Sequence, residues 1–321
     1  MSQSVTAVVR KKYNAFNLCH TIIGGVMKLE VGLALYSLMA ELKEDYMGTL
    51  ERVAEMGFKY IEYVGTPKDD QGNVVATPEA IGKKVSELGL IPISSHVMMD
   101  VDSDIDQLIS DNVLMGSQAI VLPFISMESE ERIQAIASLC NNVGRKCKEN
   151  GMDFYYHNHF HEFASIGNIT ALERLLELTD PELVYVELDT YWVKRAGLDP
   201  IEVIKKLDAR CKRIHQKDLN INASKENLVD FLVEPALMPA IFGVFQTKTK
   251  PDDIVGLGEG SLDIAGICEV TQALDYAQFI IIELDCISTL TEKDHYQQRT
   301  PLQLVASSFA NLTETLERIN A

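Results

Sequence analysis

Apolar stretches of strand length recur along the chain, separated by segments in which apolar residues have helical spacing. Eight strand-like stretches begin near Val31, Tyr60, Pro92, Ala119, Phe154, Val184, Lys212 and Phe279. Six of the seven start-to-start intervals are 27 to 35 residues, the length of one strand plus one crossover helix, and the seventh is 67. The pattern predicts eight βα units.

The segments between the strands carry helix-start signals as well as one-sided apolar spacing. Ile81 and Val85 lie four residues apart on one predicted helical face. Thr77-Pro78 and Asp199-Pro200 each place a capping residue before a proline at the first helical position, and Thr300–Gln303 has the form of a capping box. These signals predict amphipathic helices between the strands.

Eight βα units favour a closed α/β barrel, the (β/α)8 TIM barrel, over an open sheet. No G-x-G-x-x-G fingerprint follows any strand, which disfavours a dinucleotide-binding fold. We expect one barrel domain over residues 31–321, preceded by an N-terminal arm of residues 1–30. The long seventh interval predicts an insertion at about residues 221–255, after strand seven, which suits a lid or a contact within a homo-oligomer.

Composition narrows the classes of partner. The 321 residues are 46% hydrophobic and 24% charged, which is typical of a globular protein. With 29 basic and 47 acidic residues the net charge is −18, which disfavours binding to nucleic acid. No apolar run approaches the roughly 20 residues of a membrane span, and the six cysteines include no C-x-x-C pair, so we expect buried thiols and a cytoplasmic location.

Polar residues gather where the predicted strands end. In TIM barrels the active site lies at the carboxyl ends of the strands. The candidates there are Ser95 and His96 on strand three, His157, Asn158 and His159 on strand five with Glu162 beyond, Asp189 on strand six, His215 and Lys217 on strand seven, and Glu283 and Asp285 on strand eight. The two-residue period of a strand places His215 and Lys217 on the same face, which we interpret as the lumen.

This set of donors predicts one divalent metal ion. Carboxylate oxygens and imidazole nitrogens suit Mn²⁺, Co²⁺, Mg²⁺ or Zn²⁺, and the absence of ligand thiolates argues against a structural zinc. The alternative is a set of ion pairs inside the barrel. One pleat below, Glu187 and Arg213 are expected to form such an internal salt bridge and to support the site.

Two further features have two interpretations each. The glycine-rich run Gly256–Gly260, which contains Glu259, precedes a helical pattern and is either a substrate-binding loop or a simple turn. Trp192, the single tryptophan, follows Asp189 and either lines a sugar pocket or packs in the interior.

From about Val31 to its C-terminus the chain resembles the sugar phosphate isomerase/epimerase family, whose xylose-isomerase-like TIM barrels are also grouped with the second family of apurinic endonucleases. The resemblance rests on five motifs in order: YYHNHFHEF at Tyr155–Phe163, ELDTYW at Glu187–Trp192, IHQKD at Ile214–Asp218, LGEGSLD at Leu257–Asp263 and IIIELD at Ile280–Asp285. The acidic chain has neither the additional ligands nor the cationic surface of the endonuclease branch.

The resemblance implies one divalent metal held by residues of strands five to eight. Asp189, His215 and Glu283 match three of the ligand positions directly. At the strand-five position many members have glutamate, whereas this chain has His157, with Glu162 five residues later. We expect Glu162 to be the ligand because hard metal ions prefer carboxylate oxygen, with His157 as the alternative.

The resemblance also implies an isomerase or epimerase acting on a keto or aldo sugar, free or phosphorylated. A carboxylate, Glu283 or Glu162, would remove a proton next to a metal-polarised carbonyl and so form an enediolate. Lys217, His159 and His96 would donate to substrate oxygens. Two other hypotheses stay open: a dehydratase of a keto-polyol resembling inosose dehydratases, to which the strand-five histidines are suited, and a non-catalytic sugar-binding barrel.

Overall fold

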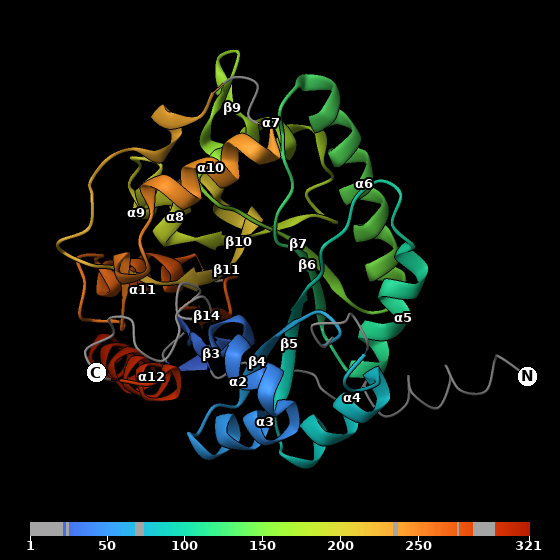
Figure 1. The fold of residues 1–321 in the computed structure, drawn as a ribbon, viewed down its shortest axis with the longest axis vertical. Helices are drawn as coiled ribbons and strands as arrows, with labels where there is room; N and C mark the ends of the chain where they lie inside the picture. Colours follow the sequence, from blue (N-terminus) through green and yellow to red (C-terminus); the bar gives the residue numbers. More distant parts are fainter. Residues whose placement is uncertain (1–21, 24–25, 68–73, 234–236, 275, 285–298) are drawn as a thin grey trace, which may run out of the picture.

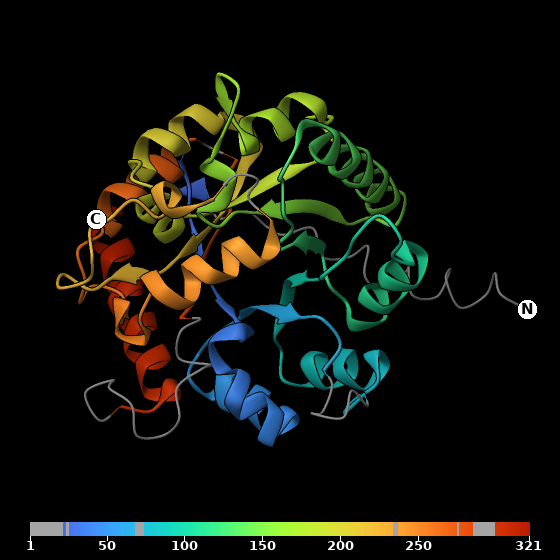
Figure 2. The ribbon, with the colours of Figure 1, turned by 45° about the horizontal axis from the view of Figure 1, so that its top comes forward.

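The computed structural model describes residues 22–23, 26–67, 74–233, 237–274, 276–284 and 299–321. Eight parallel strands form a closed barrel, with helices around the ring of strands (Figures 1 and 2). In order around the barrel the strands are β3 (Glu30–Ala34), β4 (Tyr60–Val64), β5 (Ile91–His96), β6 (Ala119–Leu122), β7 (Asp153–His157), β10 (Tyr185–Asp189), β11 (Cys211–Gln216) and β14 (Phe279–Ile282). The predicted TIM barrel is therefore confirmed.

The barrel closes between its first and last strands. β14 pairs with β3 in parallel register, from Phe279 opposite Glu30 to Ile282 opposite Leu33. The other neighbours in the barrel follow one another along the chain, apart from the short pairs β8–β9 and β12–β13 that lie between barrel strands, which is the connectivity that repeated βα units produce.

The helices begin where the sequence signals place them. Thr77 accepts a hydrogen bond from the backbone N–H of Ala80, and Thr300 and Gln303 form a capping box. The described helices are α2 (Met39–Glu44), α3 (Tyr46–Glu55), α4 (Pro78–Glu87), α5 (Ile105–Met115), α6 (Glu130–Glu149), α7 (Ala171–Leu178), α8 (Thr190–Arg195), α9 (Pro200–Leu207), α10 (Met238–Lys248), α11 (Ile264–Ala273) and α12 (Pro301–Ile319). The 3-10 segments are η1 (Leu35–Leu38), η2 (His161–Phe163), η3 (Asp208–Arg210), η4 (Leu228–Phe231) and η5 (Pro251–Asp253).

One predicted strand ends earlier than its apolar pattern indicates. The run that begins near Val184 continues to Trp192 in the sequence, but β10 stops at Asp189 and residues 190–195 form α8. The cause is a cap: the Asp189 side chain accepts a hydrogen bond from the backbone N–H of Trp192.

A small antiparallel pair forms the base of the long segment after strand seven. β12 (Asp218–Leu219) pairs with β13 (Ile254–Val255), and the chain between them contains η4, α10 and η5. Two other short pairs occur, β1 (Ile22–Ile23) with β2 (Val26–Met27), and β8 (Ser165–Ile166) with β9 (Ile169–Thr170). α10 lies beside α8 (Figure 1), since the rings of Phe245 and Trp192 are 5.1 Å apart.

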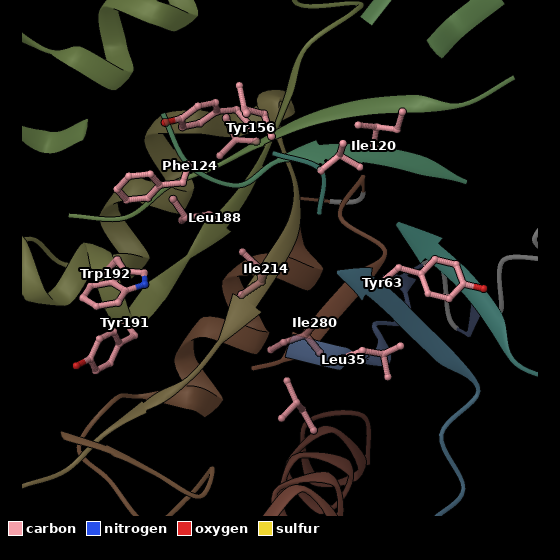
Figure 3. Packing of buried hydrophobic residues seen from close by; sticks show 14 of the residues in the cluster. Leu35, Tyr63, Ile120, Phe124, Tyr156, Leu188, Tyr191, Trp192, Ile214 and Ile280 are labelled. Atoms are coloured by element: carbon pink, nitrogen blue, oxygen red, sulfur yellow. The ribbon is translucent and has the colours of Figure 1, made fainter. Parts of the chain in front are cut away.

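The main apolar core lies between the strands and the surrounding helices. Figure 3 shows members of this cluster, among them Tyr156, Leu188 and Ile280, each fully buried. Four thiols are buried and free as expected, those of Cys140, Cys147, Cys211 and Cys268, while Cys19 and Cys286 lie outside the described residues. Within the described ranges, no helix has both the length and the apolar character to cross a membrane.

Candidate active site

Eight ionisable side chains meet inside the barrel near the carboxyl ends of its strands. All are buried, with exposed fractions between 0 and 9%. They are Glu62 of β4, His96 of β5, His157 of β7, Glu187 and Asp189 of β10, His215 of β11, and Lys217 and Glu283, which directly follow β11 and β14. The structure thus brings together His96, His157, Asp189, His215, Lys217 and Glu283, which the sequence predicted to converge.

We call His157, Asp189, His215 and Glu283 the outer group. Their ligand-type atoms all lie within 4.8 Å of one another. Nδ1 of His215 is 2.8 Å from Oε2 of Glu283, and Nε2 of His157 is 4.0 Å from Oδ2 of Asp189. Local hydrogen bonds fix Asp189, because its Oδ1 accepts from Trp192 and its own backbone N–H donates to Oδ1 of Asn158 at 3.0 Å.

Lys217 pairs with both carboxylates of the outer group. Its ammonium contacts Oδ2 of Asp189 and Oε2 of Glu283. Burial alone would raise the pKa of Glu283, but Lys217 and His215 hold this pKa well below its usual value. Lys217 thus forms a buried ion pair with Asp189 in the described structure, whereas Asp285, the other acidic candidate on strand eight, lies outside the described residues.

The outer group has the donor set of a divalent-metal site. Two carboxylates and two imidazoles suit the metals predicted from the sequence. The Lys217 ammonium contacts both carboxylates, which shows that positive charge is stabilised at this point. A divalent ion held by Asp189, His157, His215 and Glu283 would take over part of this role.

A second group lies deeper in the barrel, since its member Glu187 is one pleat below Asp189 on β10. We call Glu62, His96, Glu187 and His215 the inner group. Oε1 of Glu62 is 3.0 Å from Nε2 of His96 and 2.9 Å from Nε2 of His215. Oε1 of Glu187 is 2.9 Å from Nε2 of His96 and 3.0 Å from Nε2 of His215. His215 thus faces the outer group with Nδ1 and the inner group with Nε2.

The proton affinities of the histidines divide into two classes. Burial lowers the pKa of His96 and His215, but the nearby carboxylates outweigh it, so that the pKa of His96 is raised and that of His215 is raised well above its usual value. Burial lowers the pKa of His157 and lowers that of His159 further. His157 is therefore neutral near pH 7 and able to bind a metal or accept a proton.

The expected ion pair between Glu187 and Arg213 is not among the interactions of the described side chains. Glu187 contacts imidazoles instead, including Nδ1 of His157 at 3.6 Å. The Arg213 guanidinium lies 4.2 Å from the centre of the Tyr155 ring and donates to the backbone carbonyl of Ile93 at 3.0 Å. Although the two residues are register partners, the aromatic ring and the carbonyl provide the arginine with its contacts.

The structure places Glu162 outside both groups. Its Oε1 accepts from the Tyr156 hydroxyl at 2.6 Å, and its Oε2 accepts from the backbone N–H of His159 at 2.9 Å and lies 3.2 Å from Nδ1 of His161. The strand-five member of the outer group is His157, the alternative to Glu162. The cause is local: Glu162 lies within η2, past the end of β7, and bonds to the turn that follows the strand.

Glu259 and its glycine-rich loop also lie apart from the two groups. The backbone N–H groups of Gly258, Gly260 and Leu262 donate to the buried carboxylate of Asp218. Glu259 pairs with Arg299 at 2.6 Å. The N–H groups that could have held a phosphate therefore already have an anionic partner within the chain.

Trp192 and His159 belong to an aromatic cluster beside the outer group. Their rings are 5.4 Å apart, and Phe245 of α10 lies 5.1 Å from Trp192 and 5.7 Å from His159. The Lys217 ammonium lies 5.9 Å from the centre of the Trp192 ring. Trp192 is 2% exposed and packs in the interior, but it also borders the group that holds Lys217.

The sequence reasoning missed Glu62 and Phe245. Glu62 is a single charged residue within the apolar strand Tyr60–Val64, and this isolation was the available signal. Phe245 belongs to the segment after strand seven, and no periodicity linked it to the barrel.

A closed barrel with buried histidines and carboxylates at the carboxyl ends of its strands defines a TIM barrel with the donor set of a metal site. The family model described as the xylose isomerase-like TIM barrel matches residues 50–301. The chain belongs to this family, as the sequence motifs predicted.

Known proteins agree with this assignment. The chain is 28% identical over 160 residues to an inosose dehydratase of Clostridium tetani, a match that covers 49% of this chain and 48% of that protein. The chain thus spans about half the length of the curated relatives it matches. Among solved structures, a sugar phosphate isomerase/epimerase of Parabacteroides distasonis has a TM-score of 0.65 at 22% identity, covering 89% of this chain and 98% of the other. An IolI protein with a bound zinc atom has a TM-score of 0.63 at 12% identity, covering 90% and 99%. These two structures show the fold.

Proposed function

We propose that the protein is a metal-dependent dehydratase that removes water from a cyclic keto-polyol of the inosose class. The observation that carries this proposal is the composition of the outer group. With His157 at the strand-five position and Glu162 bonded elsewhere, Glu283 is the carboxylate left to act as a base, because Asp189 caps α8. One carboxylate base beside the proton donor Lys217 suits elimination better than epimerisation by two carboxylates.

Glu283 is the base that removes the proton next to the substrate carbonyl. Its low pKa keeps it ionised near neutral pH. When a substrate oxygen draws the Lys217 ammonium away, Glu283 loses part of the positive charge that stabilises it and becomes a stronger base.

Lys217 is the acid that assists the departing hydroxyl. The carbon–hydrogen bond next to the carbonyl breaks and its proton passes to Glu283. A carbon–carbon double bond then forms, the carbon–oxygen bond at the next carbon breaks, and the oxygen leaves as water with a proton from Lys217. Because Lys217 and Glu283 are in direct contact, the proton on Glu283 can return to Lys217 and restore both groups.

A divalent ion bound to the outer group would supply the Lewis acidity that polarises the carbonyl and acidifies the neighbouring C–H. His157, Asp189, His215 and Glu283 are the residues that would hold it. An unphosphorylated substrate is favoured because the glycine-rich loop directs its N–H groups to Asp218.

The sugar isomerase or epimerase predicted from the sequence is the second candidate. It is favoured by His157, a neutral imidazole in the same group that could serve as a second base. In that reaction the proton would return to carbon and no water would be lost.

One experiment separates these reactions from a non-catalytic sugar-binding barrel. The protein, loaded with Mn²⁺, Co²⁺ or Zn²⁺, is incubated in D₂O with an inosose and with ketohexoses, and the products are followed by NMR. Loss of water from the inosose with formation of a conjugated carbonyl supports the dehydratase. Deuterium incorporation with a rearranged or epimerised sugar would replace it by the second candidate, and binding without any exchange would leave the non-catalytic barrel. The Glu283→Gln variant is the control for background chemistry.

A further inference from the structure

We propose that the inner group binds a second divalent metal ion, through Oε1 of Glu62, Nε2 of His96 and Oε1 of Glu187, with Nε2 of His215 facing the same point. Of these four residues, this site shares His215 with the outer group, and His157 of the outer group also lies beside it, with Nδ1 3.6 Å from Oε1 of Glu187. Through its other three residues, the inner site can therefore be tested independently of the proposed dehydratase reaction.

The first argument is the spacing of the four atoms. Carboxylate oxygens and imidazole nitrogens alternate around a ring, and its four sides measure 2.9, 3.0, 2.9 and 3.0 Å. Two ligands about 2.1 Å from one metal ion and at right angles to each other lie about 3 Å apart. The ring has the dimensions of adjacent ligands around a single cation.

Hydrogen-bond geometry is met by only part of the ring. Only the contact between His96 and Glu187 has the geometry of a hydrogen bond. Oε1 of Glu62 and Nε2 of His215 have no hydrogen-bond partner among the described residues, although each lies within 3.0 Å of two atoms of the ring. Buried polar atoms in native proteins rarely lack such partners, so atoms that converge without bonding indicate an additional ligand.

Neighbouring groups aim the carboxylates into the ring. The Ser94 hydroxyl donates to Oε2 of Glu62 at 2.6 Å, which leaves Oε1 directed at the two histidines. Oε2 of Glu187 is buried without a hydrogen-bond partner among the described residues and is free to give a second bond to a metal. Hydrogen bonds of the Ser94 kind commonly orient metal ligands.

The inner group also has the negative charge that favours binding of a divalent cation. Glu62 and Glu187 are 1% and 0% exposed, and two buried carboxylates around one point require positive charge close by. Lys217 contacts the outer carboxylates, and Arg213 lies on the Tyr155 ring. A divalent ion would replace the protons on the ring nitrogens that face this point. With both sites occupied, His215 would bridge the two ions as an imidazolate, with Nδ1 toward the outer ion and Nε2 toward the inner one, while His96 would bind as a neutral imidazole. Two carboxylates with two imidazoles suit Zn²⁺, Co²⁺, Mn²⁺ or Fe²⁺.

Zinc content tests the proposal directly. The 321-residue chain is stripped with a chelator, reloaded with Zn²⁺, freed of excess metal and analysed for zinc per chain by mass spectrometry. We expect about two ions in the unchanged protein, and about one in Glu62→Gln and in Asp189→Asn, which remove a ligand of the inner and of the outer group. Glu177→Gln, the same chemical change at a residue paired with Arg174 outside both groups, is the matched control and keeps two.

A second variant and a second measurement distinguish the loss of a metal ligand from misfolding. His96→Asn removes an inner ligand from a different strand, and the circular dichroism of each variant reports its fold. Reloading with Co²⁺ gives visible absorption bands, and we expect the bands added by the second equivalent to be lost in Glu62→Gln and in His96→Asn.

The outcomes separate the two sites. One zinc in the unchanged protein and in Glu62→Gln, with none in Asp189→Asn, would overturn the inner site and leave the outer one. One zinc in the unchanged protein, none in Glu62→Gln and one in Asp189→Asn would support the inner site and overturn the outer one.

Discussion

Asp218 and Glu187 are both buried carboxylates close to the candidate active site, but only Asp218 has a hydrogen-bond donor at each of its oxygens. Asp218 accepts three backbone N–H groups from the loop that follows β13, and each of its oxygens has a donor. Glu187 faces three imidazoles with one oxygen, while its other oxygen has no hydrogen-bond partner among the described residues. A buried charge with all its partners fixes a loop, whereas one with an incomplete set of partners is open to a ligand.

The largest expected effect on turnover is at Glu283, which belongs to the outer group. Glu283→Gln removes the proposed base and one metal ligand, so we expect kcat to fall on the order of 10⁴-fold, the upper range for loss of a general base. Steady-state kinetics and metal analysis check this. Full metal occupancy together with unchanged turnover would exclude Glu283 from both roles.

Asp218→Ala removes the carboxylate that holds the glycine-rich loop. Three N–H groups lose their partner at once, and we expect the free energy of unfolding to fall by about 4 kcal/mol. Denaturant titration measures the loss. Because Asp218 belongs to neither ligand group, the zinc content of the folded variant should stay unchanged. A loss of zinc without a loss of stability would show that Asp218 serves the metal site and does not fix the loop.

Lys217→Met distinguishes an acid catalyst from a fixed ion pair. If Lys217 donates the proton, kcat falls on the order of 10²-fold while the melting temperature and the zinc content hold. A structural ion pair would give the reverse: lower stability or metal content, with the same turnover per bound metal.

Glu162→Gln compared with His157→Ala tests which strand-five residue serves the metal. Glu162 bonds to Tyr156 and to the backbone of His159, so its amide variant should lose about 2 kcal/mol of stability and keep its zinc. His157→Ala should lose the zinc of the outer group. The opposite pattern in metal analysis would restore Glu162 as the ligand.

Glu259→Gln should have the smallest effect. Glu259 and Arg299 are partly exposed, and such a pair contributes about 0.5 kcal/mol. We expect KM to stay unchanged, and a clear rise in KM would make Glu259 a substrate-binding residue after all.

The barrel was predictable because its signal is repeated eight times along the chain. Strand length, helix caps and the period of the βα units all agree, and errors at single positions such as Trp192 leave the topology intact. Asp189, His215 and Glu283 were predictable for the same reason, since each occupies the end of a strand.

Whether the other candidate residues take part in the site depends on the direction in which each side chain points. Glu162 bonds to its own turn, and Arg213 lies on an aromatic ring contributed by the second strand away. Glu62 is a lone charge in an apolar strand, whose role depends on His96 and His215 from distant parts of the chain. Neither propensity nor periodicity carries such information, because the partners are set by the closed barrel.

The pairing of β3 with β14 has a consequence for synthesis on the ribosome. Since these strands lie far apart in the sequence, the edge of β3 that faces β14 has no native partner until residues 279–282 have left the exit tunnel, while its other edge can pair with β4. Unpaired strand edges recruit other strands, and non-local pairing is slow to form. The nascent chain therefore needs protection of this edge, by chaperones or by transient contacts, while the residues between the two strands are synthesised.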